Sequence, residues 1–226
     1  NISTIYLPHK NYSMLPEILA NNICSLTEKT NRFAFTMDVL LDHTNTIMDI
    51  QWKNTYIHID SNERYDKIER NEYTSILEIT RVLNKTYTTY LSDGIQDSHD
   101  MIQYLMTLMN CEIAKTCISK KFGIYRTMKM IAEIPLHTPS CLQSLLRIWN
   151  SPGGQYELYS DDVSSLRHEC IGTTAYMHIT SPIRRIVDIV NMTLYLQYIN
   201  VLDSQSFLSK WYTPYQINRI NEKAKQ

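Results

Sequence analysis

The feature that most constrains the fold is a change of hydrophobic period along the chain. Between residues 32 and 60, apolar side chains recur at every second position, which is typical of strands. They are Phe33, Phe35, Met37, Val39, Leu41, Met48, Ile50 and Trp52. The sequence DHTN at 42–45 is typical of a turn. We therefore expect an antiparallel meander over 32–60, with residues 56–59 as its last strand.

From residue 98 onward the period becomes helical. Asp97 or Ser98 can cap a helix with one apolar stripe, and Gly123 can end it. The stripe consists of Met101, Ile102, Leu105, Met106, Met109, Ile113 and Cys117. An interrupted helical pattern covers 65–90, and a short helix is expected at 140–149. The expected fold class is α+β.

Length and composition limit the organisation and the site. The chain of 226 residues fits one large domain or two small ones, with a strand-rich part over 1–60 and a mainly helical part over 61–226. Its net charge of −1 provides no overall basic field, so any anion site must be local. The first residue is Asn rather than Met, and we expect a piece of a longer protein or a processed product.

Cysteine usage and hydropathy indicate the compartment. The cysteines are odd in number and form no CxxC pair, which favours reduced thiols in an intracellular protein. The longest apolar region, 183–201, is interrupted by charged and polar side chains and is not expected to span a membrane. We expect a cytoplasmic or other intracellular location, a viral particle or an organelle included.

The stretch YMHITSPIRRIVD at 176–188 carries the most chemical information. Thr180 or Ser181 suits a helix N-cap and Pro182 suits the first helical position, so a helix is expected to begin there. Arg184 and Arg185 would then oppose the helix dipole at a cost of about 0.3–1 kcal/mol each, which a bound phosphate would offset. Pairing of both arginines with acids elsewhere remains an equal alternative from these residues alone.

Several blocks, in order, resemble motifs of the RNase II/RNase R catalytic (RNB) family. They are ISTIYLPHKNYSMLPEILANNICSL at 2–26, MTLMNCEIA at 106–114, Tyr125-Arg126, His168 with its spacing to Tyr176, and YMHITSPIRRIVD at 176–188. The resemblance implies the RNB catalytic-domain fold, in which antiparallel strands and then packed helices surround an RNA channel. The chain would be a partial RNB domain over 1–226, incomplete at its N-terminus.

The resemblance also implies an activity. The family consists of 3′→5′ exoribonucleases that hydrolyse single-stranded RNA with Mg²⁺. Arg184 would contact the phosphate near the scissile bond as the catalytic residue. The substrate-binding residues carried over by the resemblance are Tyr65, Asn110, Arg126, Tyr176, His178, Thr180, Ser181 and Arg185. For Asn110, fixing the local geometry is the simpler interpretation.

Departures from the family keep a second interpretation open. The family's Mg²⁺ ligands are aspartates upstream of the 2–26 block, so the ligands are expected upstream of this chain and none within it. Asp161 and Asp162 are interpreted as a helix N-cap, and Tyr104 stands where the family has an acid. The alternative is a catalytically degenerate RNB-fold protein that binds RNA or serves as a structural component of a larger assembly, a viral one included.

Overall fold

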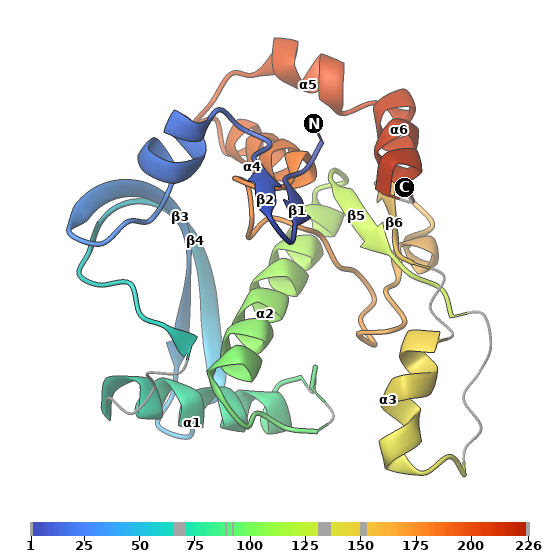
Figure 1. Cartoon of the computed structure of the whole chain (residues 1–226). Coiled ribbons are helices and arrows are strands. Elements are labelled where there is room, and N and C mark those ends of the chain that lie inside the picture. Colours follow the sequence, from blue (N-terminus) through green and yellow to red (C-terminus); the bar gives the residue numbers. More distant parts are fainter. Residues whose placement is uncertain are drawn as a thin grey trace. The chain divides into compact units, whose positions relative to one another are not determined.

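The computed structural model describes residues 2–65, 71–88, 90–91, 93–130, 137–149 and 153–224. Two compact units divide the chain (Figure 1). Unit 1 comprises Asn1–Met14 and Asn110–Gln226, and unit 2 comprises Leu15–Met109. Helices and antiparallel strands occur together, which confirms the predicted α+β class. No helix within the described ranges combines the length and the apolar character that a membrane crossing requires.

Unit 2 is built on a long two-stranded ribbon of β3 (Thr30–Leu41) and β4 (Ile47–Ile59). The predicted turn is confirmed: Asp42 Oδ1 accepts hydrogen bonds from the backbone N–H groups of Thr44 (2.8 Å) and Thr46 (2.9 Å). The predicted meander is wrong, because β4 is one strand that pairs along β3, with a register shift between Leu40 and Leu41, and residues 56–59 are its end. Ile50 and Trp52 are half-buried and Asn54 and Tyr56 are exposed, yet the backbone stays paired with β3 through these positions, so no second turn forms.

Helices cover part of this ribbon within unit 2. The helix α1 (Asn71–Thr86) is continuous, whereas an interrupted one was expected, and α2 (Ser98–Ser119) begins at the predicted cap. Asp97 Oδ1 accepts a hydrogen bond from the N–H of Asp100 (3.1 Å). The buried core consists of Leu83, Ile95, Met101, Tyr104 and Leu108, with Met37, Leu41 and Ile47 of the ribbon packed against it. A short π-helix, η1 (Leu19–Ile23), precedes the ribbon.

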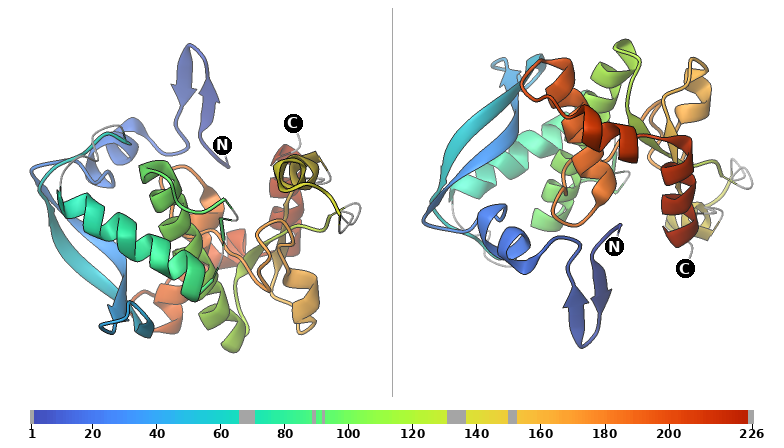
Figure 2. Two further views of the ribbon diagram at one scale, coloured as in Figure 1. Left: turned by 90° about the horizontal axis from the view of Figure 1, so that it is seen from below. Right: turned by 90° about the horizontal axis from the view of Figure 1, so that it is seen from above.

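Unit 1 combines short strands with the C-terminal helices, and the second half of α2, from Asn110 on, also belongs to it. Its elements are β1 (Ile5–Leu7), β2 (Lys10–Tyr12), β5 (Ile124–Thr127), α3 (Ser140–Trp149), β6 (Gln155–Leu158), the 3-10 helix η3 (Val163–Leu166), α4 (Ile186–Tyr198), α5 (Gln205–Trp211) and α6 (Pro214–Ala224). The predicted helix at 140–149 is confirmed as α3. The hairpin β1–β2 projects from the rest of unit 1 in both views of Figure 2.

The core of unit 1 lies between the β5–β6 pair and the helices α4 to α6. It consists of Ile124, Tyr156, Ile186, Val187, Val190, Leu208, Ile217 and Ile220. Figure 1 shows α6 alongside β6, and Asn221 of α6 hydrogen-bonds both backbone groups of Tyr156 (2.7 and 2.8 Å). Strands β5 and β6 were not predicted, because four residues each carry too little alternation to be recognised.

Candidate functional site

The helix that follows the TSPIRR motif begins later than the sequence predicted. Helix α4 starts at Ile186, and Arg185 is its N-cap residue in an extended conformation, with φ −138° and ψ 127°. Residues Ser181–Arg185, which we call the arginine turn, form a tight turn instead. The N–H groups of Arg184 and Arg185 both donate to the carbonyl oxygen of Ser181 (3.1 Å each). The expected cap at Thr180 or Ser181, with Pro182 in the first helical position, is therefore wrong.

Pairing with the start of the chain explains the late helix start. The N–H of Thr4 donates to the carbonyl of Arg184 (3.0 Å), and the N–H of Ile186 donates to the carbonyl of Ile2 (3.0 Å). Ser3 and Arg185 form an antiparallel bridge. These bonds require an extended backbone at Arg185, so helical geometry cannot begin before Ile186.

One arginine of the turn is anchored and the other is not. Arg185 Nε and Nη2 donate to the two carboxylate oxygens of Asp188 (2.7 and 2.8 Å). Asp188 is fully buried and also accepts a hydrogen bond from the N–H of Ser181 (2.7 Å). Burial raises the pKa of Asp188, while Arg185 and this N–H act in the opposite direction. Arg184 is exposed, and no carboxylate among the described residues pairs with it.

Two buried asparagines hold the segment that leads into the arginine turn. Asn110 of α2 accepts a hydrogen bond from the N–H of Ile179 (3.0 Å) and donates to the Tyr176 hydroxyl (3.0 Å) and to Thr180 Oγ1 (3.4 Å). Asn191 of α4 donates to the carbonyl of His178 (2.9 Å). Because this segment has no regular secondary structure, these side chains fix its backbone.

The imidazole groups near the turn are neutral. The Tyr156 hydroxyl hydrogen-bonds His178 Nδ1 (2.8 Å), and burial lowers the pKa of His178 to about 2, with further lowering by Arg185 and Arg126. Burial also lowers the pKa of His168 to about 4, with Arg126 adding to the shift. The rings of His168 and His178 both contact Tyr176 edge-on, at centroid distances of 5.3 and 5.4 Å.

A third arginine completes the positive cluster. Arg126 of β5 lies with its guanidinium carbon 4.7 Å from the centre of the Tyr156 ring. Burial lowers the pKa of Arg126, and the nearby charge of Arg185 lowers it further. Within the described residues no carboxylate pairs with Arg126, so its charge is partly desolvated and uncompensated. A cluster of this kind can bind a phosphate-like anion.

The structure brings together all the predicted site residues of unit 1. They are Asn110, Arg126, Tyr176, His178, Thr180, Ser181, Arg184 and Arg185. Tyr65 belongs to unit 2, where its half-exposed ring stacks on His99 at a centroid distance of 4.0 Å. The sequence reasoning missed Tyr156, Asp188 and Asn191 as partners of these residues. The spacing of Arg185 and Asp188, three residues apart, was the one available signal.

The described residues do not fit a magnesium site. Mg²⁺ takes oxygen ligands in an octahedral arrangement, commonly one or two carboxylates with waters and phosphates. Asp188 is the buried acid of the cluster, and Arg185 and Ser181 occupy its oxygens. In the part of the chain that the structure describes, no group of three or more His, Cys, Asp or Glu side chains could hold a metal ion.

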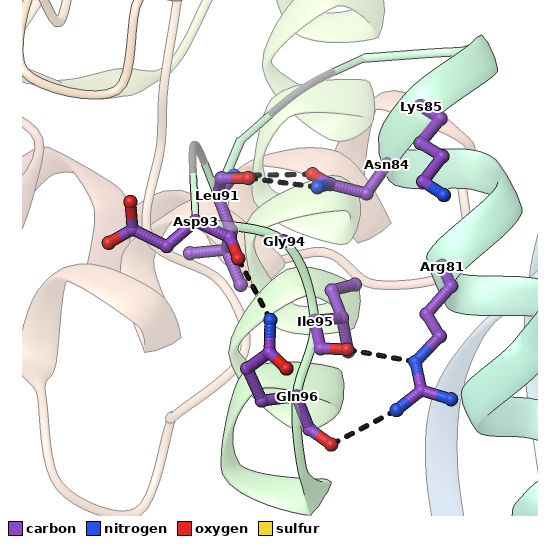
Figure 3. Close-up of a pocket in the computed structure, with 8 residues that line it drawn as sticks. All are labelled: Arg81, Asn84, Lys85, Leu91, Asp93, Gly94, Ile95 and Gln96. Carbon is purple, nitrogen blue, oxygen red and sulfur yellow. Dashed lines mark hydrogen bonds between the residues drawn. The ribbon is translucent and has the colours of Figure 1, made fainter. Parts of the chain in front are cut away.

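A pocket in unit 2 is a weaker candidate. Figure 3 shows Arg81 and Asn84 of α1 facing the loop that precedes α2. Arg81 donates to the carbonyls of Ile95 (2.8 Å) and Gln96 (3.1 Å), and Asn84 hydrogen-bonds both backbone groups of Leu91 (2.9 and 3.2 Å). The hydrogen bonds of these side chains therefore hold the loop in place, which is a structural role.

Comparisons with known proteins agree with the motifs. Residues 1–72 match the family model described as the RNB domain. Ribonuclease R of Mycoplasma genitalium is 24% identical over 83% of this chain and 36% of its own length. A probable exosome complex exonuclease RRP44 of Caenorhabditis elegans is 21% identical over 91% of this chain and 29% of its own length. The chain thus spans about a third of the length of these curated relatives.

Solved structures share the fold over nearly the whole chain. Mycoplasma genitalium RNase R in complex with ribose methylated single-stranded RNA aligns with a TM-score of 0.70 and 20% identity, over 98% of this chain and 44% of that one. Yeast Ssd1, described as a pseudonuclease, aligns with a TM-score of 0.69 and 14% identity, over 90% of this chain and 33% of that one. Residues 1–72 are therefore similar in sequence to the RNB domain, and nearly the whole chain is similar in fold to RNase R.

Proposed function

We propose that this chain binds the phosphate backbone of single-stranded RNA in a 3′→5′ exoribonuclease of the RNase R kind. The observation that carries the proposal is the arginine turn. There the side chain of Arg184 is exposed, while its backbone N–H is bonded to Ser181 and its carbonyl to Thr4. The names of the relatives, a ribonuclease and an exosome exonuclease, support the same class of reaction.

Each residue of the site has a distinct part in this proposal. Arg184 donates hydrogen bonds to the phosphate oxygens near the scissile bond and stabilises the charge that grows there during hydrolysis. Arg185, whose charge is balanced by Asp188, holds the turn rigid. His178 stays neutral near pH 7 because its pKa is lowered to about 2, so its ring serves as wall and hydrogen-bonding group rather than as a proton donor.

The proposed reaction uses Mg²⁺. Its ligands would come from outside this chain, since the described residues do not fit a metal site. The chain's own contribution is therefore binding and orientation of the phosphodiester. The proposal assigns the positioning of the substrate to Arg184, Arg185 and Arg126.

The test follows the shortening of a 5′-labelled single-stranded RNA by the complete protein with Mg²⁺. The wild type is expected to release nucleotides from the 3′ end. Arg184→Ala is expected to lower kcat by about 10²–10³, the range seen when one charge-stabilising donor is removed. The matched control is Arg219→Ala, which removes an exposed arginine stacked on Tyr215 of α6. Equal rates for Arg184→Ala and the wild type would remove Arg184 from the mechanism.

A second candidate is an RNB-fold protein that binds RNA without cleaving it. It is favoured by the shared fold with yeast Ssd1, described as a pseudonuclease, because that likeness shows that the fold alone does not require activity. The same assay separates the two candidates. A wild type that binds the RNA tightly and leaves it intact with Mg²⁺ supports the second candidate against the first.

A further inference from the structure

The position of Arg126 depends on a residue without a side chain. Arg126 of β5 lies opposite Tyr156 of β6, and Gly154 comes just before that strand. A methyl group built on Gly154 would lie 2.6 Å from Arg126 Nε and 3.0 Å from its Cζ. It would also lie 3.1 Å from the carbonyl oxygen of Thr127. The guanidinium therefore rests against the bare backbone of Gly154, and any larger residue would displace it.

Tyr156 fixes the other side of the same guanidinium. Its ring lies under Arg126, its hydroxyl bonds His178 (2.8 Å), and its backbone N–H and carbonyl are both bonded to Asn221 (2.7 and 2.8 Å). Tyr156 is buried in the core of unit 1. The ring therefore cannot swing away, and it serves as a rigid platform for Arg126.

The guanidinium held in this way has unused hydrogen-bonding capacity. An arginine carries five N–H donors, and no hydrogen bond from the Arg126 side chain to a described residue is found. Holding a half-buried cation close to Arg185 without an acid costs free energy. A bound anion would remove that cost, because it would fill the donors and neutralise the charge.

We propose that Gly154 and Tyr156 are positioning residues that present Arg126 as a second phosphate contact for the RNA backbone, beside the arginine turn. The inference rests on the proposed function, since it concerns the same anion site. Gly154 supplies the space, Tyr156 supplies the platform, and Arg126 supplies the charge and the planar set of donors that a phosphate group accepts.

The test is a double-mutant cycle on RNA binding by the 226-residue chain. Anisotropy of a fluorescein-labelled single-stranded oligoribonucleotide gives Kd at several salt concentrations for the wild type, Gly154→Ala, Arg126→Ala and the double variant. Arg126→Ala is expected to weaken binding about tenfold or more, as for other charged hydrogen bonds. The slope of log K against log salt should fall by about 0.7, the value for one phosphate contact on a single strand. Gly154→Ala should also weaken binding and lower the salt slope, by much of the amount expected for Arg126→Ala.

The cycle separates an effect through Arg126 from general damage to the fold. Gly154→Ala is expected to weaken RNA binding when Arg126 is present. In the Arg126→Ala background it is expected to cause no further loss of affinity. Arg126→Lys should keep most of the salt slope but lose affinity, since the planar donors are gone. Arg219→Ala is the control for loss of an exposed charge, and thermal unfolding reports the fold of each variant.

Four outcomes would overturn the inference. Arg126→Ala that binds RNA with the affinity and salt slope of the wild type removes the second contact, and this test stands even if Gly154→Ala fails to fold. A Gly154→Ala effect that persists in the Arg126→Ala background removes the positioning role. A wild-type chain that does not bind RNA overturns the proposed function together with this inference. If Arg184→Ala loses RNA binding and Arg126→Ala keeps it, the inference is overturned and the proposed function is not.

Discussion

At the scale of single residues, the buried His168 and the half-buried His178 link the site to the stability of the protein. His168 and His178 stay uncharged in the folded state, because burial and nearby arginines lower their pKa values to about 4 and about 2. In the unfolded chain each would take up a proton near pH 6.5. Below that pH the unfolded state binds more protons, so acid favours unfolding.

The predicted effect is a loss of unfolding free energy as the pH falls from about 6.5 to about 4, by up to about 1.4 kcal/mol per pH unit for each histidine. Urea unfolding at several pH values measures it. His178→Asn is expected to make the pH dependence shallower by one histidine's share. His43→Asn, an exposed residue of the β3–β4 turn, is the control. An unchanged pH dependence in His178→Asn would contradict the assignment.

The sequence alone identified residues of the candidate site, but it did not identify the residues that contact them. The order TSPIRR brought Arg184, Arg185 and His178 to attention, and the structure places them in one cluster. The choice between pairing with acids and binding an anion was open. Asp188 resolves it for Arg185, whereas no carboxylate among the described residues pairs with Arg184. Tyr156 could not be predicted, because its contact with Arg126 depends on the pairing of β5 with β6.

At the scale of elements, asparagine side chains of helices tie down neighbouring backbone. Asn191 of α4 accepts a hydrogen bond from the N–H of Ile124 (2.8 Å) and donates to the carbonyls of Ile124 and His178 (2.9 Å each). It therefore joins α4, β5 and the segment before the arginine turn. Because Asn191 is fully buried, water cannot replace these bonds.

Asn191→Leu is expected to lower the unfolding free energy by about 2–5 kcal/mol, since it leaves the buried polar groups of Ile124 and His178 without partners. Urea unfolding near neutral pH measures the difference. Asn218→Leu on the exposed face of α6 is the matched control and should change stability by about 0.5 kcal/mol or less. A cost for Asn191→Leu that equals that of the control would show that these bonds do not hold the elements together.

Elements with a long hydrophobic pattern or a clear turn signal could be predicted from the sequence. Boundaries that depend on pairing with distant residues could not. The stripe from Met101 to Cys117 predicted α2, and the DHTN signal predicted the turn of the ribbon. The start of α4 was misplaced, because Ile2 and Thr4 pair with the backbone around Arg185 and override a favourable capping sequence. Such pairing between distant residues leaves no mark in the local pattern.

At the scale of the whole molecule, the chain concentrates positive charge without being basic. Its net charge is −1, yet Arg126, Arg184 and Arg185 act together on His178 within unit 1. In the proposed function, the attraction of RNA therefore rests on one local cluster rather than on an overall field. The chain spans about a third of the length of its curated relatives.

The most direct test of the account is the affinity of the 226-residue chain for single-stranded RNA as salt is varied, with Arg184→Ala and Arg219→Ala measured beside the wild type. The account predicts that log K falls linearly with log salt, and that the affinity of Arg184→Ala is lower than that of Arg219→Ala by about tenfold or more. Equal affinities and salt slopes for these two variants would contradict the claim that the arginine turn binds the RNA backbone.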